Sequence, residues 1–190
     1  MNALFMAISY REPTAPERDS SARPVVGLAL RFGIGVGLVC VLWMVGLQLT
    51  GNNGFGPKQL MAQLLVPLVA VASQLWLRRQ VKPAKPGLGR SLGVGTLTVL
   101  LAAVVSAVGV LALAAGAGET ALARHRAEVV EIVQAQQRAA PQPQLTAAQR
   151  EQQQQKVERL TVGDMASSNF LQVLVIGLVL AVPAGIFLRE

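Results

Sequence analysis

Four long apolar stretches, separated by polar ones, dominate the hydrophobic pattern of the chain. Each is close to the ~20 residues that a helix needs to cross a hydrocarbon core of ~30 Å. The predicted spans are residues 25–49, 59–77, 91–116 and 167–188. The pattern therefore predicts an all-α integral membrane protein, in which four helices form a bundle.

Two polar segments flank or interrupt these spans. Residues 1–24 form a polar, proline-containing start, which we expect to be a disordered cytoplasmic tail ahead of a membrane domain at 25–190. Residues 117–166 should form a helical extramembrane segment between the third and fourth spans. Pro141 and Pro143 divide that segment, and Thr146 with Gln149 forms a capping-box pattern that starts a second helix. Its two helices could pack as a hairpin or form a solvated, frayed linker, and the thin apolar stripe leaves both alternatives open.

The composition supports a membrane class. Hydrophobic residues make up 52% of the chain, the mean hydropathy is +0.47, and charged residues are 14%, against about 25% in soluble domains. Cys40 is the one cysteine, so no intrachain disulfide can form.

The placement of charge predicts an orientation. Residues 117–166 hold six Lys or Arg and six Asp or Glu, so the net charge of +7 comes from the rest of the chain. Five of the cations lie in the connector at 78–90, which has no carboxylate. By the positive-inside rule, the connector and both termini face the cytoplasm and 117–166 lies outside, in a bacterial cytoplasmic membrane. This placement also argues against a nucleic-acid partner.

Small residues recur at helical spacing in three spans. Gly33 and Gly37 form a GxxxG pair, Ala102 is followed by Ser106, and Gly177, Ala181 and Gly185 repeat every four residues. Such rows let helix backbones approach closely in lipid, although glycine is also common in membrane helices. We expect these seven residues to mark helix-packing faces, within the bundle or in a homo-oligomer.

A few polar residues lie at membrane depth. Gln63 and Gln74 share one face of the second span, and they either form interhelical hydrogen bonds or line a hydrated pathway. Arg31 lies about two turns inside the first span and either snorkels to the headgroups or binds lipid phosphate. Arg78 and Arg79 are further candidates for contact with lipid headgroups. His125 has no partner histidine or cysteine and is expected to be exposed rather than a metal ligand.

The layout resembles a family of uncharacterised small bacterial membrane proteins with four spans, described only as a domain of unknown function. The matching pieces are Arg78-Arg79, Leu92-Gly93-Val94-Gly95, Gln152 to Lys156, and Asn169-Phe170-Leu171 with Gly177. The resemblance covers residues 25–190. It implies the four-span fold but no activity, so it supplies no site residues.

Three classes of function remain at this point. Coupled transporters usually carry Asp, Glu or His within their spans, and these spans have none. A membrane enzyme needs a nucleophile with a base or a metal set, and no such motif is present. We therefore predict a non-catalytic multi-pass protein without a cofactor, which scaffolds or binds a membrane or extracytoplasmic protein through 117–166. The alternative is a small transporter or channel subunit.

Overall fold

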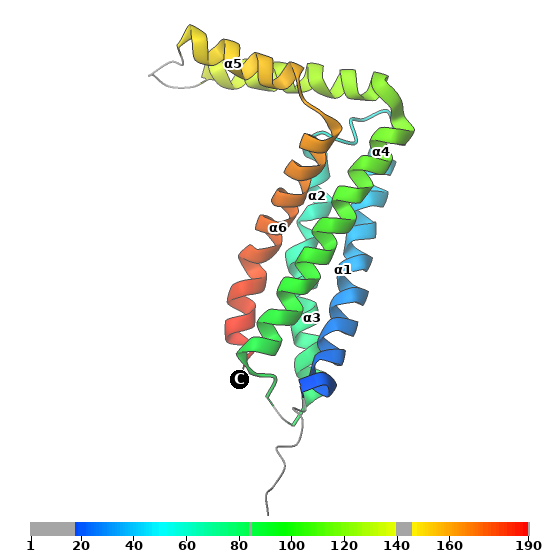
Figure 1. Cartoon of the computed structure of the whole chain (residues 1–190), viewed down its shortest axis with the longest axis vertical. Coiled ribbons are helices and arrows are strands. Elements are labelled where there is room, and N and C mark those ends of the chain that lie inside the picture. The colour runs from blue at the N-terminus through cyan, green and yellow to red at the C-terminus, as the bar shows by residue number, and fades with distance from the viewer. Residues whose placement is uncertain (1–17, 84, 140–145, 190) are drawn as a thin grey trace, which may run out of the picture.

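The protein is an all-α membrane helical bundle. The computed structural model describes residues 18–83, 85–139 and 146–189, so most of the predicted tail lies outside the described residues. Within the described part, four helices are long and apolar enough to cross a membrane, judged by length and composition. Figure 1 shows α1, α3, α6 and the first part of α4 side by side, with α5 and the outer part of α4 lying across one end of the bundle.

The helices follow one another with short connections. Their bounds are α1 Arg18–Leu49, η1 Pro57–Gln59, α2 Leu60–Gln63, α3 Leu65–Val81, α4 Gly87–Ala139, α5 Ala147–Glu158 and α6 Val162–Phe187. α1 begins at Arg18 rather than at residue 25, so Pro24 lies inside the helix.

The second span is divided near its start. η1 and α2 precede α3, and the break falls just after Gln63. Pro67 explains the position of the break, because a proline has no N–H to donate to the carbonyl four residues earlier, here that of Gln63.

The helix that contains the third apolar stretch continues past residue 116. α4 runs on to Ala139, with a sharp bend at Gly118, where φ is 73° and ψ is −178°. A positive φ of this size is adopted readily by glycine and rarely by other residues, so Gly118 allows the bend. We call residues 119–139 of α4, together with α5, the arm.

The arm is a helical hairpin, not a frayed linker. α5 lies along the outer part of α4 (Figure 1), and Gln137 Nε2 donates to Gln153 Oε1 at 2.8 Å. Thr146 and Gln149 form the predicted capping box at the start of α5. A second capping box, formed by Thr161 and Asp164, starts α6 and returns the chain to the bundle.

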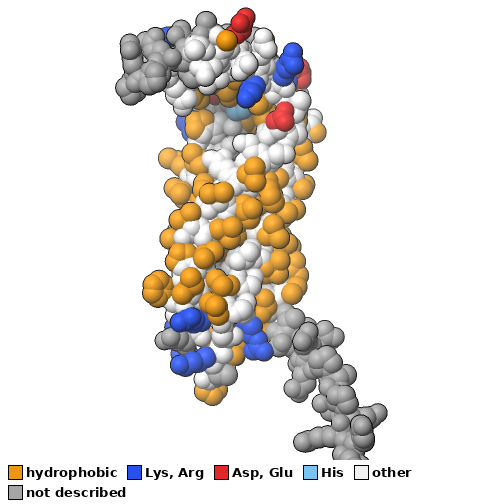
Figure 2. Space-filling view, turned by 60° about the vertical axis from the view of Figure 1, so that its left-hand side comes forward, with side chains coloured by type: hydrophobic (Ala, Val, Ile, Leu, Met, Phe, Trp, Pro, Cys, Tyr) orange, Lys and Arg blue, Asp and Glu red, His pale blue; other side chains and the backbone are white. Residues whose placement is uncertain are grey.

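The membrane-spanning part of α4 packs against α1, α3 and α6, and its contacts with α1 and α6 are the most extensive between any two helices. α1 approaches it closely at two glycines. A Cβ at Gly33 would lie 2.7 Å from Leu101 Cβ, and one at Gly37 would lie 2.7 Å from Val105 Cβ. Figure 2 shows apolar side chains around the middle of the bundle, with Lys and Arg at the connector end.

Candidate functional site

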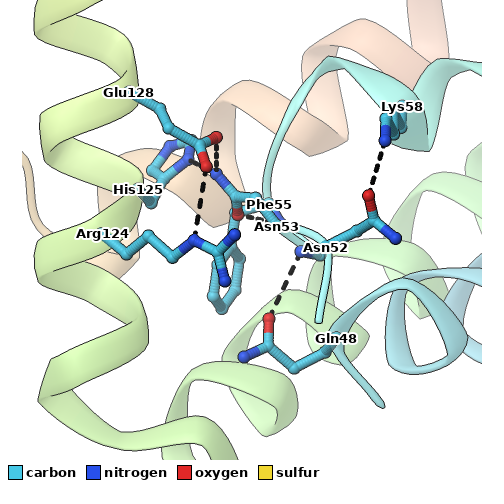
Figure 3. Close-up of polar contacts among 9 residues, drawn as sticks. Gln48, Asn52, Asn53, Phe55, Lys58, Arg124, His125 and Glu128 are labelled. Carbon is cyan, nitrogen blue, oxygen red and sulfur yellow. Dashed lines mark hydrogen bonds and ion pairs between the residues drawn. The ribbon is translucent and has the colours of Figure 1, made fainter. Parts of the chain in front are cut away.

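The turn after α1 is tied to the arm through Asn53. Its Nδ2 donates to Glu128 Oε2 at 2.6 Å and lies 3.0 Å from His125 Nδ1, while its Oδ1 accepts from the Phe55 N–H at 2.9 Å. Glu128 also pairs with Arg124 at 3.5 Å. Figure 3 shows these side chains meeting between the turn and α4. The Nδ2 end of the Asn53 amide thus joins the turn to the arm, and its Oδ1 end holds the turn itself.

His125 is half-buried, and the prediction that it would be exposed is wrong. The ring of Phe55 lies against it, with centroids 5.8 Å apart. Burial lowers the pKa of His125 below its ordinary value of 6.5, and Glu128 opposes this shift only in part. The neutral ring suits the contact, because Nδ1 can then accept from Asn53 Nδ2.

A cavity of about 250 Å³ lies under the arm, next to this junction. The first half of α6 forms one wall, the region from Phe55 to Gln59 another, and the arm the roof. The lining residues are Phe55, Gln59, Val110, His125, Val129, Leu160, Asp164, Met165, Ser168, Asn169 and Gln172. The arm is held over this cavity on a second side, where Arg126 donates to the Leu160 carbonyl at 3.0 Å and pairs with Glu119 at 2.9 Å.

A buried polar relay lies beside the cavity. Gln63 Nε2 donates to Asn169 Oδ1 at 2.9 Å, and Asn169 Nδ2 donates to Ser106 Oγ at 2.9 Å. The relay joins α2, α6 and α4. Gln63 Oε1 is buried and has no hydrogen-bond partner among the described residues.

Gln74 makes the corresponding interhelical bond nearer the connector. Its Nε2 donates to the carbonyl of Ala181 at 2.7 Å. Gly95 and Gly185 border this side chain so closely that a Cβ at Gly95 would overlap it. Both glutamines therefore form interhelical hydrogen bonds, which was the first of the two alternatives for this face.

The other predicted packing residues also lie between helices. Ala102 is fully buried on α4, and its carbonyl lies near Gly37 of α1. Gly177 lies against Val99 and Val66, and Ala181 is buried in the same cluster as these two valines. α3 and α4 thus fill the small-residue face of α6.

The cationic candidates lie on the surface. Arg31 and Arg79 are exposed and Arg78 is half-exposed, all on helices that reach the connector end. Figure 2 shows Lys and Arg gathered at that end, below the apolar band. Their contact with lipid headgroups stays a prediction.

Sequence reasoning missed the cavity and the junction. A signal for one wall was present, because Asp164, Ser168 and Gln172 recur every four residues and so share one face of α6. Asn169 inside the fourth apolar stretch was a second signal, since a buried amide in a membrane helix needs a partner. Nothing in the local pattern could indicate that Asn53 meets Glu128, because the two are 75 positions apart.

The described residues contain no group of three or more His, Cys, Asp or Glu side chains that could hold a metal ion. No curated protein and no solved structure matches the chain. A family model does match, over residues 31–190, which cover all four apolar helices except the start of the first. By this match the chain belongs to the family described as "Protein of unknown function (DUF4199)".

Proposed function

We propose that this is a non-catalytic multi-pass protein of a bacterial cytoplasmic membrane, which binds a protein partner through the arm on the outer side. The proposal has two parts, an orientation in the membrane and a docking surface. The connector and both termini would then face the cytoplasm.

The connector supports the orientation. Lys82, Lys85 and Arg90 are exposed at the end of the bundle opposite the arm, and Arg78 and Arg79 lie on the last turn of α3. Cations concentrated in a short loop favour the cytoplasmic side, whereas a long segment of balanced charge, such as 117–166, has little influence.

The observation that carries the docking proposal is that the arm is fixed at both flanks and still overhangs the bundle. Asn53, in the turn after α1, binds Glu128 on the α4 part of the arm, and Arg126 donates to the carbonyl of Leu160, just ahead of α6. Figure 1 shows the free end of the hairpin reaching past α6. A surface held in one geometry loses less conformational freedom when a partner binds. Ile132, which is 41% exposed, gives this surface an apolar anchor.

Cysteine labelling in intact cells tests the orientation. In a Cys40→Ala background, Lys85→Cys and Gln153→Cys would each be treated with an impermeant thiol reagent. Both positions are exposed, so accessibility depends on the side of the membrane. We expect labelling of Gln153→Cys alone in intact cells and of both variants after lysis. Labelling of Lys85→Cys alone in intact cells would reverse the orientation.

Photo-crosslinking tests the docking surface. A photoreactive amino acid at Ile132 on the arm would be compared with one at Val179, which is 63% exposed on the apolar face of α6. We expect a discrete protein adduct from Ile132 and mainly lipid adducts from Val179. Equal adduct patterns at the two positions would contradict a partner site on the arm.

A small transporter or channel subunit is the second candidate, and one observation favours it. Seven polar side chains among the described residues are buried in the bundle, and Gln63, Gln74 and Ser91 each have an oxygen without a partner. Water could complete their hydrogen bonds. Flux of a small solute into liposomes that contain the protein, above that of empty liposomes, would favour this candidate.

A further inference from the structure

An apolar groove lies on the surface of the bundle, between α1 and the divided second span. Its volume is about 400 Å³, within the ~300–1,000 Å³ range of typical ligand pockets. Ala62 is 5% exposed and forms the floor, whereas the other lining residues are 41–68% exposed and form the rims. The lining residues are Val39, Leu42 and Trp43 of α1, Met61 and Ala62 of α2, and Leu65 of α3.

The groove lies on two of the apolar spans, at bilayer depth. Trp43 is about two turns from the end of α1 at Leu49, a level typical of the membrane interface, where tryptophan is enriched. Val39 and Leu65 lie deeper along their helices. The one hydrogen-bond donor among the lining side chains, the Trp43 indole N–H, already donates to the Lys58 carbonyl at 3.1 Å. The groove therefore suits an aliphatic chain that enters from the bilayer, since a polar occupant would lose its hydrogen bonds there.

A cation lies at the arm end of the groove. Lys58 is exposed on η1, and its backbone carbonyl is the one that Trp43 binds. Its side chain donates to the neutral amide oxygen of Asn52 (Figure 3), and no ion pair among the described residues includes it. Arg124 and Arg126 of the arm, by contrast, each pair with a glutamate. The charge of Lys58 is therefore free to attract an anion at the level of the lipid headgroups.

We propose that this groove binds one acyl chain of an anionic phospholipid, whose phosphate lies on the ammonium group of Lys58. The chain would lie over Ala62, between the rims formed by α1 and α2, with the headgroup near the level of Trp43. An anionic lipid is favoured over a zwitterionic one, because a choline headgroup would bring a second cation to Lys58. The site is separate from partner binding by the arm and holds for either orientation in the membrane.

Fluorescence quenching of Trp43 tests the site directly. In the full-length Trp76→Phe protein, which keeps an aromatic ring beside Phe32, Trp43 is the one tryptophan. Nanodiscs of phosphatidylcholine would receive increasing fractions of phosphatidylglycerol or phosphatidylcholine with brominated acyl chains, which quench tryptophan at contact. We expect about fivefold stronger binding of the brominated phosphatidylglycerol, because one lysine near the surface attracts anionic lipid by ~1 kcal/mol. Equal quenching by the two lipids would overturn the proposal.

Lys58→Gln tests the phosphate contact. It removes the charge but keeps the backbone carbonyl that Trp43 binds and a side chain that can donate to Asn52, so the local fold should persist. We expect the two brominated lipids to quench equally in this variant, and Lys58→Arg to retain the preference. Arg79→Gln removes an exposed cation at the connector end and should leave the preference unchanged. A preference that survives in Lys58→Gln would overturn the assignment of the phosphate.

Val39→Phe tests the chain contact. Val39 is 45% exposed in the groove, so the larger ring extends into the groove rather than into the bundle. We expect the preference for phosphatidylglycerol to be lost, whereas Val179→Phe, on the exposed face of α6, should keep it. Unchanged quenching in Val39→Phe would overturn the assignment of the groove. If neither lipid quenched Trp43 and the protein eluted as a dimer, the groove would belong to a second copy of the chain, which would also overturn the proposal.

Discussion

The bundle can be divided into a connector half, next to residues 78–90, and an arm half, next to the arm. Each half buries a glutamine between helices, but the surroundings of the two glutamines differ. In the connector half, Gln74 donates to the backbone carbonyl of Ala181, and the close approach of Gly95 leaves no free space. In the arm half, Gln63 donates to Asn169, whose own side chain lines the cavity. Both glutamines are 1% exposed.

The two glutamines differ in the groups that accept their hydrogen bonds, a backbone carbonyl for Gln74 and a side chain for Gln63. A backbone carbonyl is present whatever the side chain, so the bond of Gln74 depends on the small residues Gly95 and Gly185, which let α4 and α6 approach the Gln74 side chain of α3. The bond of Gln63 depends on another polar side chain, which in turn needs Ser106. The connector half is therefore expected to respond to changes of volume, and the arm half to changes of polarity.

Ala181→Leu should have the largest effect, in the connector half. Ala181 is 1% exposed and α3 and α4 fill the face around it, so the added atoms have no space. Overpacking of this kind costs about 1–3 kcal/mol, and we expect the upper end here because the carbonyl of Ala181 also holds Gln74. Thermal unfolding in nanodiscs would measure the change.

Leu180→Ala is the control for this substitution. Leu180 is 43% exposed on the neighbouring face, so its truncation should cost much less. If both variants unfolded at the same temperature as the wild type, the connector half would not be the closely packed region described above.

Asn169→Leu should have the next largest effect, in the arm half. It removes the partner of Gln63 Nε2 and of Ser106 Oγ, and a buried group left unpaired costs about 1–3 kcal/mol. The double variant Gln63→Leu with Asn169→Leu should cost less than the sum of the two single changes, because both polar partners are then absent. Strict additivity in the same unfolding assay would argue against the relay.

The sequence predicts the connector half better than the arm half, for a physical reason. Packing in lipid follows small residues at a regular spacing, and Gly177, Ala181 and Gly185 show that spacing along one helix. The bend at Gly118 and the contact between Asn53 and Glu128 depend on how distant segments meet, which no local period records. The break after Gln63 is intermediate, because Pro67 was visible but its effect on the helix start was not predicted.

Acid should loosen the arm half while leaving the connector half unchanged. Burial holds the pKa of His125 below 6.5, so the unfolded state takes up the proton before the folded state does. Stability is then complete above pH 6.5 and falls as the pH drops from there towards the lowered pKa. Protonated Nδ1 would also become a donor facing the donor of Asn53, while the charge of Glu128 would favour the protonated ring only in part.

Hydrogen exchange at pH 7.5 and pH 5.5, corrected for the intrinsic rate, would measure this loosening. We expect faster exchange at low pH in residues 119–139 and no change in the membrane-spanning part of α4. His125→Asn, which cannot titrate in this range, should remove the difference. A pH effect that persisted in this variant would assign it to another group.

Arg31→Leu should have the smallest effect and probes the surface of the connector half. Arg31 is exposed on α1, away from the contacts that α1 makes with α4 through Gly33. Surface changes of this kind usually alter stability by less than about 0.5 kcal/mol, and a snorkelling arginine fits that range.

A lipid-phosphate site at Arg31 predicts a different result. In that case the variant would fold normally but lose the thermal stabilisation that anionic lipid gives to the wild type. Arg79→Leu is the matched control, because Arg79 lies at the connector end, where loss of one cation among five should change lipid binding only slightly. Loss of the anionic-lipid effect in Arg31→Leu alone would show that snorkelling is not the whole role of this residue.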